Sequence, residues 1–389
     1  MTGIRLSFVY SKEDEFGKGL PNDGAWIAPP PGARFRCTMA RQTTRIQAVG
    51  TKHWDTYAYG VFQGSWDMTF MLDYNYLEPF YFVFENASNP VKPEGKSYYT
   101  CSFAKADAKR VPSFTVRLVQ LNNMAGGPAG SDQIVTLKGC VCKSMTLARA
   151  AGSSQFQVTM SGFYVDEVME KGSLSKTDYQ EYTGNLAEYS CLYTSEAADA
   201  DGLEDCNYVA NTESLTVAID NSAEAIYNVC SPFATQYHEG TTNYTFSAVT
   251  YRNNPANWEQ RVYTGGQTNT AKSPLSKGLK PMNLAYILTY SAEVDESAEG
   301  RRTPKEAYKS SDYAIGIKIQ KCVISSLERP NGEGSKLVDS ISSADCQLIS
   351  LDVRTSSKTF GFKTTDKNSH EVNVVTISTG QTNSNDQGA

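Results

Sequence analysis

The sequence predicts a mainly β protein with two tandem β-sandwich or barrel domains, each carrying one short flanking helix. Apolar and polar residues alternate in many segments, which is typical of half-buried strands. The composition, with 23 Tyr and 29 Gly, favours strands and turns over helices. One order of strand, acidic turn, short aromatic helix, strands and long hairpin runs over residues 32–166 and again over 187–354.

Four short matches support an internal repeat. Chance alignments rarely keep the same order over four matches, so we interpret the pattern as a tandem duplication. The matched runs are residues 36–38 with 190–192, 68–73 with 215–220, 99–103 with 244–248, and 139–145 with 321–327.

Each copy is expected to hold one short amphipathic helix after the acidic residue that closes a strand. The apolar faces are Leu77, Phe80, Tyr81 and Phe84 in the first copy and Ile226, Val229, Cys230 and Phe233 in the second. Asn75 and Glu78 would form a capping pair at the first helix. Ser222 would cap the second helix, and Pro232 would end it.

Strands are expected through the remainder of both copies. They are predicted at residues 116–120, 133–147 and 156–163 in the first copy, and at 284–290 and 313–323 in the second. Two long connections, residues 122–132 and 293–312, are polar and carry no core pattern of their own.

Three segments lie outside the repeated units. An N-terminal arm covers residues 1–31 and ends in a proline-rich spacer, and we expect it to pack on a neighbouring molecule. The linker over residues 167–186 is the first part of an acidic stretch that we expect to be solvated. The C-terminal extension, 355–389, is expected to be partly disordered, with a hairpin whose strands lie at 359–362 and 372–377.

Composition and charge argue against several classes of protein. The net charge of -6 and the pI near 5.3 argue against a duplex-DNA binder, which needs a basic surface. No stretch approaches eighteen consecutive apolar residues, and the first residues lack the apolar core of a signal peptide. We therefore expect assembly in a cytoplasm, with most of the nine cysteines reduced and buried.

No residue pattern indicates catalysis, and we expect no enzyme activity, catalytic residue, cofactor or metal site. Cys140 and Cys142 would face the same way on a strand, but the three histidines, His53, His238 and His370, are isolated in sequence. This favours core packing over a zinc site. The sequence contains no nucleophile elbow or phosphate-binding loop. Carboxylate pairs for glycoside hydrolysis stay open, because such pairs meet in space and not in sequence.

An aromatic cluster leaves a second alternative open. It could be a platform for a ligand, but alternation across strands and packing between subunits are favoured. Its members are Trp54, Tyr57, Tyr59, Phe62 and Trp66.

The run GSWDMTFMLDYNYLEPF at residues 64–80, followed by residues 135–147 and 156–163, resembles the tail tube proteins of long-tailed bacteriophages. Residues 6–17 and the proline-rich spacer are similar as well. The likeness covers both copies and consists of a pattern with short runs, without a diagnostic motif. It implies tail-tube-type domains whose sheets join into a β-barrel ring. It also implies that rings stack into a hollow tube, which encloses the tape-measure protein and conducts DNA to the host.

For this chain the resemblance implies a structural subunit of the virion tail, assembled in the host cytoplasm. Single-domain subunits of that family form hexameric rings, so a duplicated subunit is expected to form trimeric rings. Expected partners are further copies of the chain, the tape-measure protein, the tail terminator, and baseplate or tail-tip proteins. DNA is a partner in transit only, and no membrane insertion is expected. The alternative is another β-rich virion component, such as a tail decoration, a baseplate protein, a carbohydrate-binding protein or a glycan-cleaving enzyme.

Three further expectations concern the structure of the assembled tube. The connections 122–132 and 293–312 would bridge one ring to the next. The cysteines would be free thiols in the particle. The lumen would be net negative, because a basic wall would bind the phosphates of passing DNA.

Overall fold

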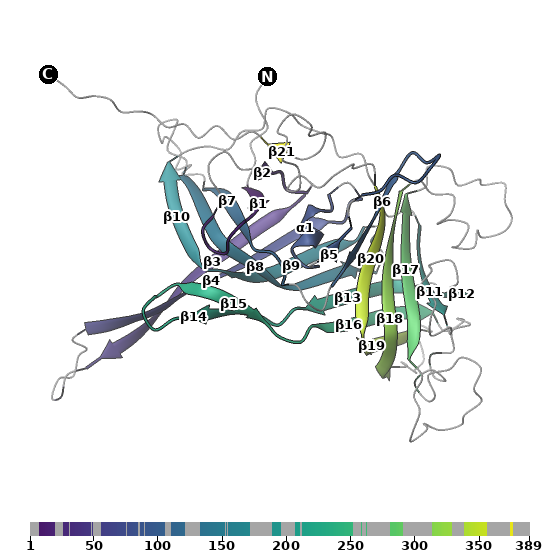
Figure 1. Ribbon diagram of the computed structural model, residues 1–389. Helices are drawn as coiled ribbons and strands as arrows, with labels where there is room; N and C mark the ends of the chain where they lie inside the picture. The colour runs from purple at the N-terminus through teal and green to yellow at the C-terminus, as the bar shows by residue number, and fades with distance from the viewer. Residues whose placement is uncertain are drawn as a thin grey trace, which may run out of the picture.

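The computed structural model is mainly β, as the sequence predicts, with three sheets joined through shared strands, one two-stranded ribbon and the short helix α1 (Figure 1). The structure describes residues 8–19, 26–30, 32–47, 49, 56–74, 76–84, 86–88, 90–105, 110–120, 133–151, 153, 155–171, 189–195, 207–210, 212–251, 258, 262, 281–290, 313–328, 338–355 and 374–375.

The first sheet has the strand order β21–β2–β1–β7–β8–β10, and all neighbours are antiparallel. Strand β21 comes from the C-terminal extension, so that extension returns to the N-terminal part of the fold. The strands are β1 (Phe8–Lys12), β2 (Trp26–Ile27), β7 (Phe114–Gln120), β8 (Gln133–Arg149), β10 (Asp166–Lys171) and β21 (Val374–Val375).

The second sheet has eight antiparallel strands in the order β3–β4–β9–β8–β13–β16–β19–β18. Strand β8 belongs to both sheets, because its earlier residues pair in the first sheet and its later residues pair in the second. The added strands are β3 (Arg34–Ile46), β4 (Thr56–Met71), β9 (Gln157–Tyr164), β13 (Thr212–Asp220), β16 (Asn243–Tyr251), β18 (Tyr313–Glu328) and β19 (Val338–Cys346).

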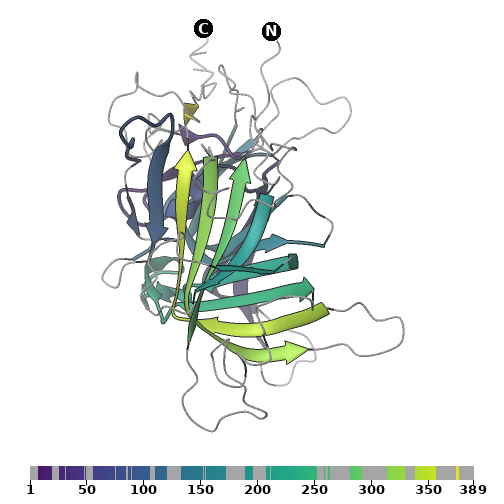
Figure 2. The same ribbon diagram turned by 90° about the vertical axis from the view of Figure 1, so that its right-hand side faces the viewer.

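The third sheet has the order β12–β11–β17–β18–β20–β6–β5, and its strands run across those of the eight-stranded sheet (Figure 2). Its further strands are β5 (Asn86–Ala87), β6 (Tyr99–Ala104), β11 (Tyr189–Ser195), β12 (Asn207–Ala210), β17 (Met282–Tyr290) and β20 (Leu348–Thr355). A separate ribbon pairs β14 (Ala223–Tyr227) with β15 (Ala234–Glu239).

The two halves of the chain repeat one pairing order. Strands β1–β7–β8–β10 in the N-terminal half correspond to β11–β17–β18–β20 in the C-terminal half. Strands β3–β4–β9–β8 likewise correspond to β13–β16–β19–β18. Bulges also recur at equivalent places, between Cys142 and Ser144 and between Ile324 and Ser326.

Strands β8 and β18 pass from one sheet into the next at equivalent residues. Gly139 has φ 63° and Lys321 has φ 49°, which is the left-handed region that non-glycine residues avoid. A Cβ atom at Gly139 would lie 2.4 Å from Cγ2 of Val165, so lack of space excludes a side chain there, whereas Lys321 shows that a larger residue can adopt this conformation. The match of residues 139–145 with 321–327 therefore aligns structurally equivalent positions.

The other three sequence matches join strands that are not equivalent. Strand β3 corresponds to β13 and not to β11, and β4 corresponds to β16 and not to β13. Strand β6 has no counterpart in β16, because it belongs to the third sheet. Runs of three to six alternating residues are common to many half-buried strands, so they align without marking equivalent positions.

The segments assigned to an arm and a linker belong partly to the sheets. Strand β1 pairs with β7 as β11 pairs with β17, so residues 8–12 of the predicted arm belong to the first sheet. The predicted linker, 167–186, starts inside β10, which pairs with β8. These residues form strands because they complete the edges of a sheet that would otherwise leave backbone groups unpaired.

The first predicted helix exists as α1 (Glu78–Tyr81), but its N-cap is Leu77 and makes no side-chain hydrogen bond. Asn75 lies outside the described residues. Helix α1 packs its Phe80 ring against Phe70 and Phe103, at centroid distances of 6.2 and 5.9 Å, inside the core between the sheets.

The second predicted helix is wrong, because those residues form the β14–β15 ribbon. Ile226 and Phe233, expected on its buried face, are 40% and 42% exposed. Ala223, by contrast, is buried against Val141 of the N-terminal half. Packing against the N-terminal half therefore decides the conformation of a segment whose apolar spacing also fits a helix.

The strands predicted at 116–120, 133–147, 156–163, 284–290 and 313–323 are confirmed. The connections 122–132 and 293–312 and the C-terminal strand at 359–362 lie outside the described residues.

Candidate assembly interface

The structure joins the two halves of the chain edge to edge. The later part of β8, the last strand of the N-terminal half in the eight-stranded sheet, pairs with β13, the first strand of the C-terminal half. The register runs from Ser144 opposite Asp220 to Arg149 opposite Leu215. The backbone N–H of Asn221 donates to the carbonyl of Lys143 (2.8 Å), which continues the pairing. Two four-stranded units therefore form one continuous sheet.

The β14–β15 ribbon reinforces this junction by lying on the N-terminal half. Ala223 packs in an apolar cluster with Val111 and Val141. The rings of Phe16 and Tyr237 border this cluster, and their centroids lie 4.9 Å from each other. The Tyr227 hydroxyl donates to the carbonyl of Phe62 (2.9 Å). The ribbon therefore acts as a clamp that crosses from one half to the other.

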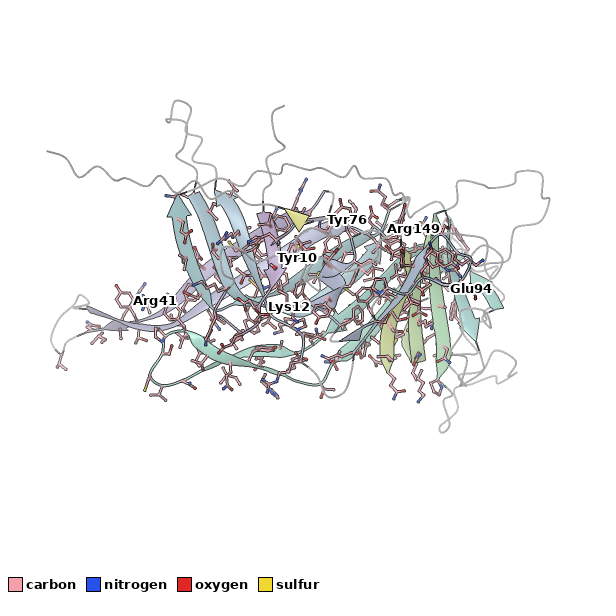
Figure 3. All side chains as sticks on the ribbon, turned by 45° about the horizontal axis from the view of Figure 1, so that its top comes forward. Tyr10, Lys12, Arg41, Tyr76, Glu94 and Arg149 are labelled. Carbon is pink, nitrogen blue, oxygen red and sulfur yellow. The ribbon has the colours of Figure 1, made fainter. Side chains whose placement is uncertain are left out.

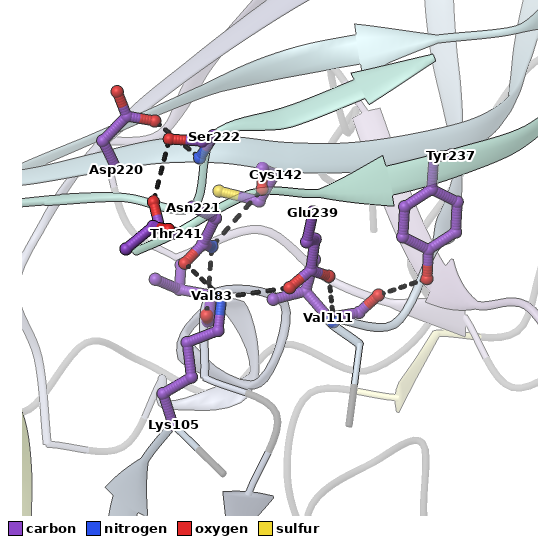
Figure 4. Close-up of polar contacts among 10 residues, drawn as sticks. All are labelled: Val83, Lys105, Val111, Cys142, Asp220, Asn221, Ser222, Tyr237, Glu239 and Thr241. Atoms are coloured by element: carbon purple, nitrogen blue, oxygen red, sulfur yellow. Dashed lines mark hydrogen bonds and ion pairs between the residues drawn. The ribbon is translucent and has the colours of Figure 1, made fainter. Parts of the chain in front are cut away.

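A buried polar cluster fixes the base of this clamp (Figure 4). The Lys105 ammonium group lies 3.0 Å from a Glu239 carboxylate oxygen and donates to Oδ1 of Asn221 (3.0 Å). The other oxygen of Glu239 accepts from the backbone N–H of Val111, whose carbonyl accepts from the Tyr237 hydroxyl. Lys105 and Val111 belong to the N-terminal half, and the other three residues belong to the C-terminal half. The Lys105 and Glu239 side chains are 13% and 8% exposed, so little solvent screens the pair.

A third contact joins the halves in the third sheet. Strand β6 of the N-terminal half pairs with β20 of the C-terminal half, from Phe103 opposite Leu351 to Tyr99 opposite Thr355. The Arg354 guanidinium group lies 4.9 Å from the centroid of the Tyr98 ring, next to this pairing.

The eight-stranded sheet ends in two edges that have no neighbouring strand among the described residues. One is β3, and the other is the last part of β18, residues 323–328. These edges occupy the positions that β13 and β8 occupy at the internal junction. Met39 on β3 is 63% exposed, whereas its counterpart Ile219 on β13 is 1% exposed. Leu327 is likewise half-buried, whereas its counterpart Met145 is 1% exposed.

The outer part of the β3–β4 hairpin projects beyond the rest of the fold, with Arg41 on it (Figures 1 and 3). The Arg41 guanidinium group lies over the Tyr59 ring at 4.9 Å, and Tyr59 is 68% exposed. Ile46 near the tip is 46% exposed. An exposed edge and exposed apolar residues on one projecting element are typical of an interaction surface.

Two neighbouring rows of side chains on one face of the eight-stranded sheet are mostly polar. Directly paired residues point to the same face, so the cross-strand rows can be followed through the sheet. One row is Arg36, Asp67, Ser161, Ser144, Asp220 and Asn243, and the next is Arg34, Thr69, Thr159, Thr146, Ala218, Thr245 and Asp345. The hydroxyl groups of Ser144 and Ser161 lie 2.7 Å apart on this face. Six of these thirteen side chains carry hydroxyl groups, and three are acidic against two arginines.

The residues weighed for chemistry are mostly in the core. Cys140 and Cys142 are fully buried, and burial raises the pKa of both thiols. The described residues contain no group of three or more metal-binding side chains. Phe62 and Trp66 of the aromatic cluster are 9% and 2% exposed, which agrees with packing. Tyr59 is exposed, and the side chains of Trp54 and Tyr57 lie outside the described residues.

Sequence reasoning did not identify the edges as a site. One signal was present: in the two hairpins, residues 34–46 and 56–71 align with the residues 180 positions later, which pairs Gly60 with Gly240 and Ile46 with Ile226. That constant spacing differs from the spacings of the short matches. Only the strand pairing shows which spacing relates structurally equivalent residues.

No protein-family model matches the chain, and no curated protein matches it. Among the helices that the structure describes, none is long and apolar enough to cross a membrane.

Proposed function

We propose that this chain is a structural subunit of a bacteriophage tail tube, which assembles into rings that stack as a hollow cylinder. The internal junction carries the proposal. It shows that the last strand of one four-stranded unit pairs with the first strand of another. The free edge of β18 corresponds to that of β8, and the free edge of β3 corresponds to that of β13. Copies can therefore continue the sheet head to tail.

Head-to-tail contacts between different surfaces close into rings or continue as open filaments. A closed ring removes the sheet edges altogether, which satisfies the backbone groups that an edge leaves unpaired. Each chain supplies two equivalent units, so a ring with six units needs three chains. A barrel made from three eight-stranded sheets is wider than the barrels of roughly 16–18 strands that already enclose a channel.

The polar face of the eight-stranded sheet supports a conducting lumen. Its rows carry Asp67, Asp220 and Asp345 against Arg34 and Arg36. Hydroxyl groups and a slight acidic excess would form few charged contacts with phosphate groups. This agrees with the expectation that DNA passes without binding, if this face lines the channel.

Negative-stain electron microscopy of the purified chain tests the proposal. Hollow cylinders whose ring averages contain three chains would support it. Rings of six chains, or a monomer that persists at high concentration in sedimentation velocity, would overturn it. A density map with the lumen-facing side chains counted tests the electrostatic part, and an excess of Lys and Arg on the wall would contradict it.

A further inference from the structure

We infer that the outer β3–β4 hairpin is an intermolecular clamp, which docks on the C-terminal half of a second copy as β14–β15 docks on the N-terminal half of its own chain. This inference rests on the proposed self-assembly and adds the register and the residues of the contact. It commits to one partner, another copy of this chain.

The two hairpins correspond residue by residue. Ala40 opposite Gln63 matches Asp220 opposite Asn243, and Thr43 opposite Tyr59 matches Ala223 opposite Glu239. The spacing between these pairs is the same in both hairpins. A Cβ atom on Gly60 would lie 3.0 Å from Gln42, and one on Gly240 would lie 3.0 Å from Ser222 at the matching position. The β3–β4 hairpin is therefore built like the clamp.

Only one of these two hairpins is covered in the isolated chain. Ile219 and Ala223 are each 1% exposed because the N-terminal half lies against them. Met39 and Tyr59, on the matching hairpin, are 63% and 68% exposed. The surface that would cover them is the end of β18 with β19, at the opposite end of the same sheet. A second copy must therefore supply it.

Charge supports the choice of partner. Strand β3 carries four arginines and no acidic residue. The receiving strands carry Glu328 at the end of β18, and Asp339 and Asp345 on β19. If copies repeat the internal junction, Thr38 lies opposite Glu328 of the next copy, and Arg36 lies two positions from Thr38 on the same face. Arg36 then lies diagonally across from Glu328, so the two charges are complementary in the contact between copies.

The internal junction also fixes the register. Ala218 opposite Thr146 corresponds to Thr38 opposite Glu328 of the next copy. The hydrogen bond from Asn221 to Lys143 makes this a pair without backbone hydrogen bonds of its own, because the two kinds of pair alternate. Cα atoms in such pairs lie about 4.5 Å apart, within reach of a disulfide.

Cysteine pairing in trans tests the register. T38C and E328C, made as separate full-length proteins and mixed under oxidising conditions, should give a covalent dimer. The matched control mixes A40C with E328C, in which an exposed residue on the same face is shifted by two positions and lies beyond disulfide reach. The dimer should be lost in the control.

Charge reversal tests the contact between copies. R36E should weaken assembly, and combining R36E with E328R in one chain should restore it. Tubes that form while the T38C and E328C proteins remain uncrosslinked, or crosslink no better than the control, would overturn the inference and leave the proposed function standing. Absence of any assembly by the unmodified chain would overturn both.

Discussion

Met39 and Ile219 offer a direct test of whether the outer edge of β3 is an assembly surface. They occupy equivalent positions, yet Met39 is 63% exposed and Ile219 is 1% exposed. Complete burial of a methionine side chain contributes roughly 1.5–3 kcal/mol. Covering the exposed part of Met39 on assembly should therefore contribute about 1–2 kcal/mol per contact.

Met39→Ala should remove most of that contribution. Since 1.4 kcal/mol corresponds to a tenfold change in affinity, the dissociation constant of each contact should rise by about 5- to 30-fold. The unassembled chain should keep its stability within about 0.5 kcal/mol, because an exposed side chain contributes little to folding. Sedimentation velocity over a concentration series measures the first effect, and denaturant unfolding below the assembly concentration measures the second.

Ile219→Ala is the matched control, because it makes a comparable truncation at the internal junction. Removing this buried side chain should cost about 2–5 kcal/mol of folding free energy. The two variants should thus differ in kind: one weakens association, and the other weakens the fold. If Met39→Ala assembles at the same concentration as the unmodified chain, the outer edge of β3 is not the assembly surface.

Four further outcomes test the rest of the structure. Glu239→Gln should destabilise the chain by about 2–4 kcal/mol in denaturant unfolding, because it leaves a buried lysine without its carboxylate, whereas the exposed Glu224→Gln should change little. Gly139→Ala should cost several times more than Gly95→Ala: both glycines have positive φ, but a Cβ clashes only at the first. Cys230 should be alkylated at pH 8.5 well before the buried cysteines, since burial raises the pKa of their thiols. The same shift predicts falling stability as the pH rises above about 8.5, because the folded chain then holds protons that the unfolded chain releases.

Specific results would contradict these predictions. Equal unfolding free energies for the two glutamate variants would mean that the polar cluster does not hold the clamp. Equal costs at the two glycines would remove the steric argument for the bend in β8. Rapid alkylation of Cys142 in the folded chain would show that its strand opens or lies at a surface.

The sequence by itself determined the class of the fold and the position of most strands. Alternating residues along 156–163 and the apolar run in 133–147 predict β9 and β8 correctly, because a strand that is half or fully buried imposes its pattern locally. The buried state of Cys140 and Cys142 also followed from their place on such a strand. These features depend on neighbours within a few residues.

Only the tertiary structure decided which strands are equivalent and which edges stay open. Residues 223–239 carry a spacing that fits a helix, but contacts with Val111 and Val141, about a hundred residues earlier, make them a two-stranded ribbon. Likewise, nothing local distinguishes Met39 from Ile219, because both are apolar residues on alternating strands. One is buried and the other exposed because β13 has a neighbour within the chain and β3 does not, and pairing between distant strands is not encoded in either strand alone.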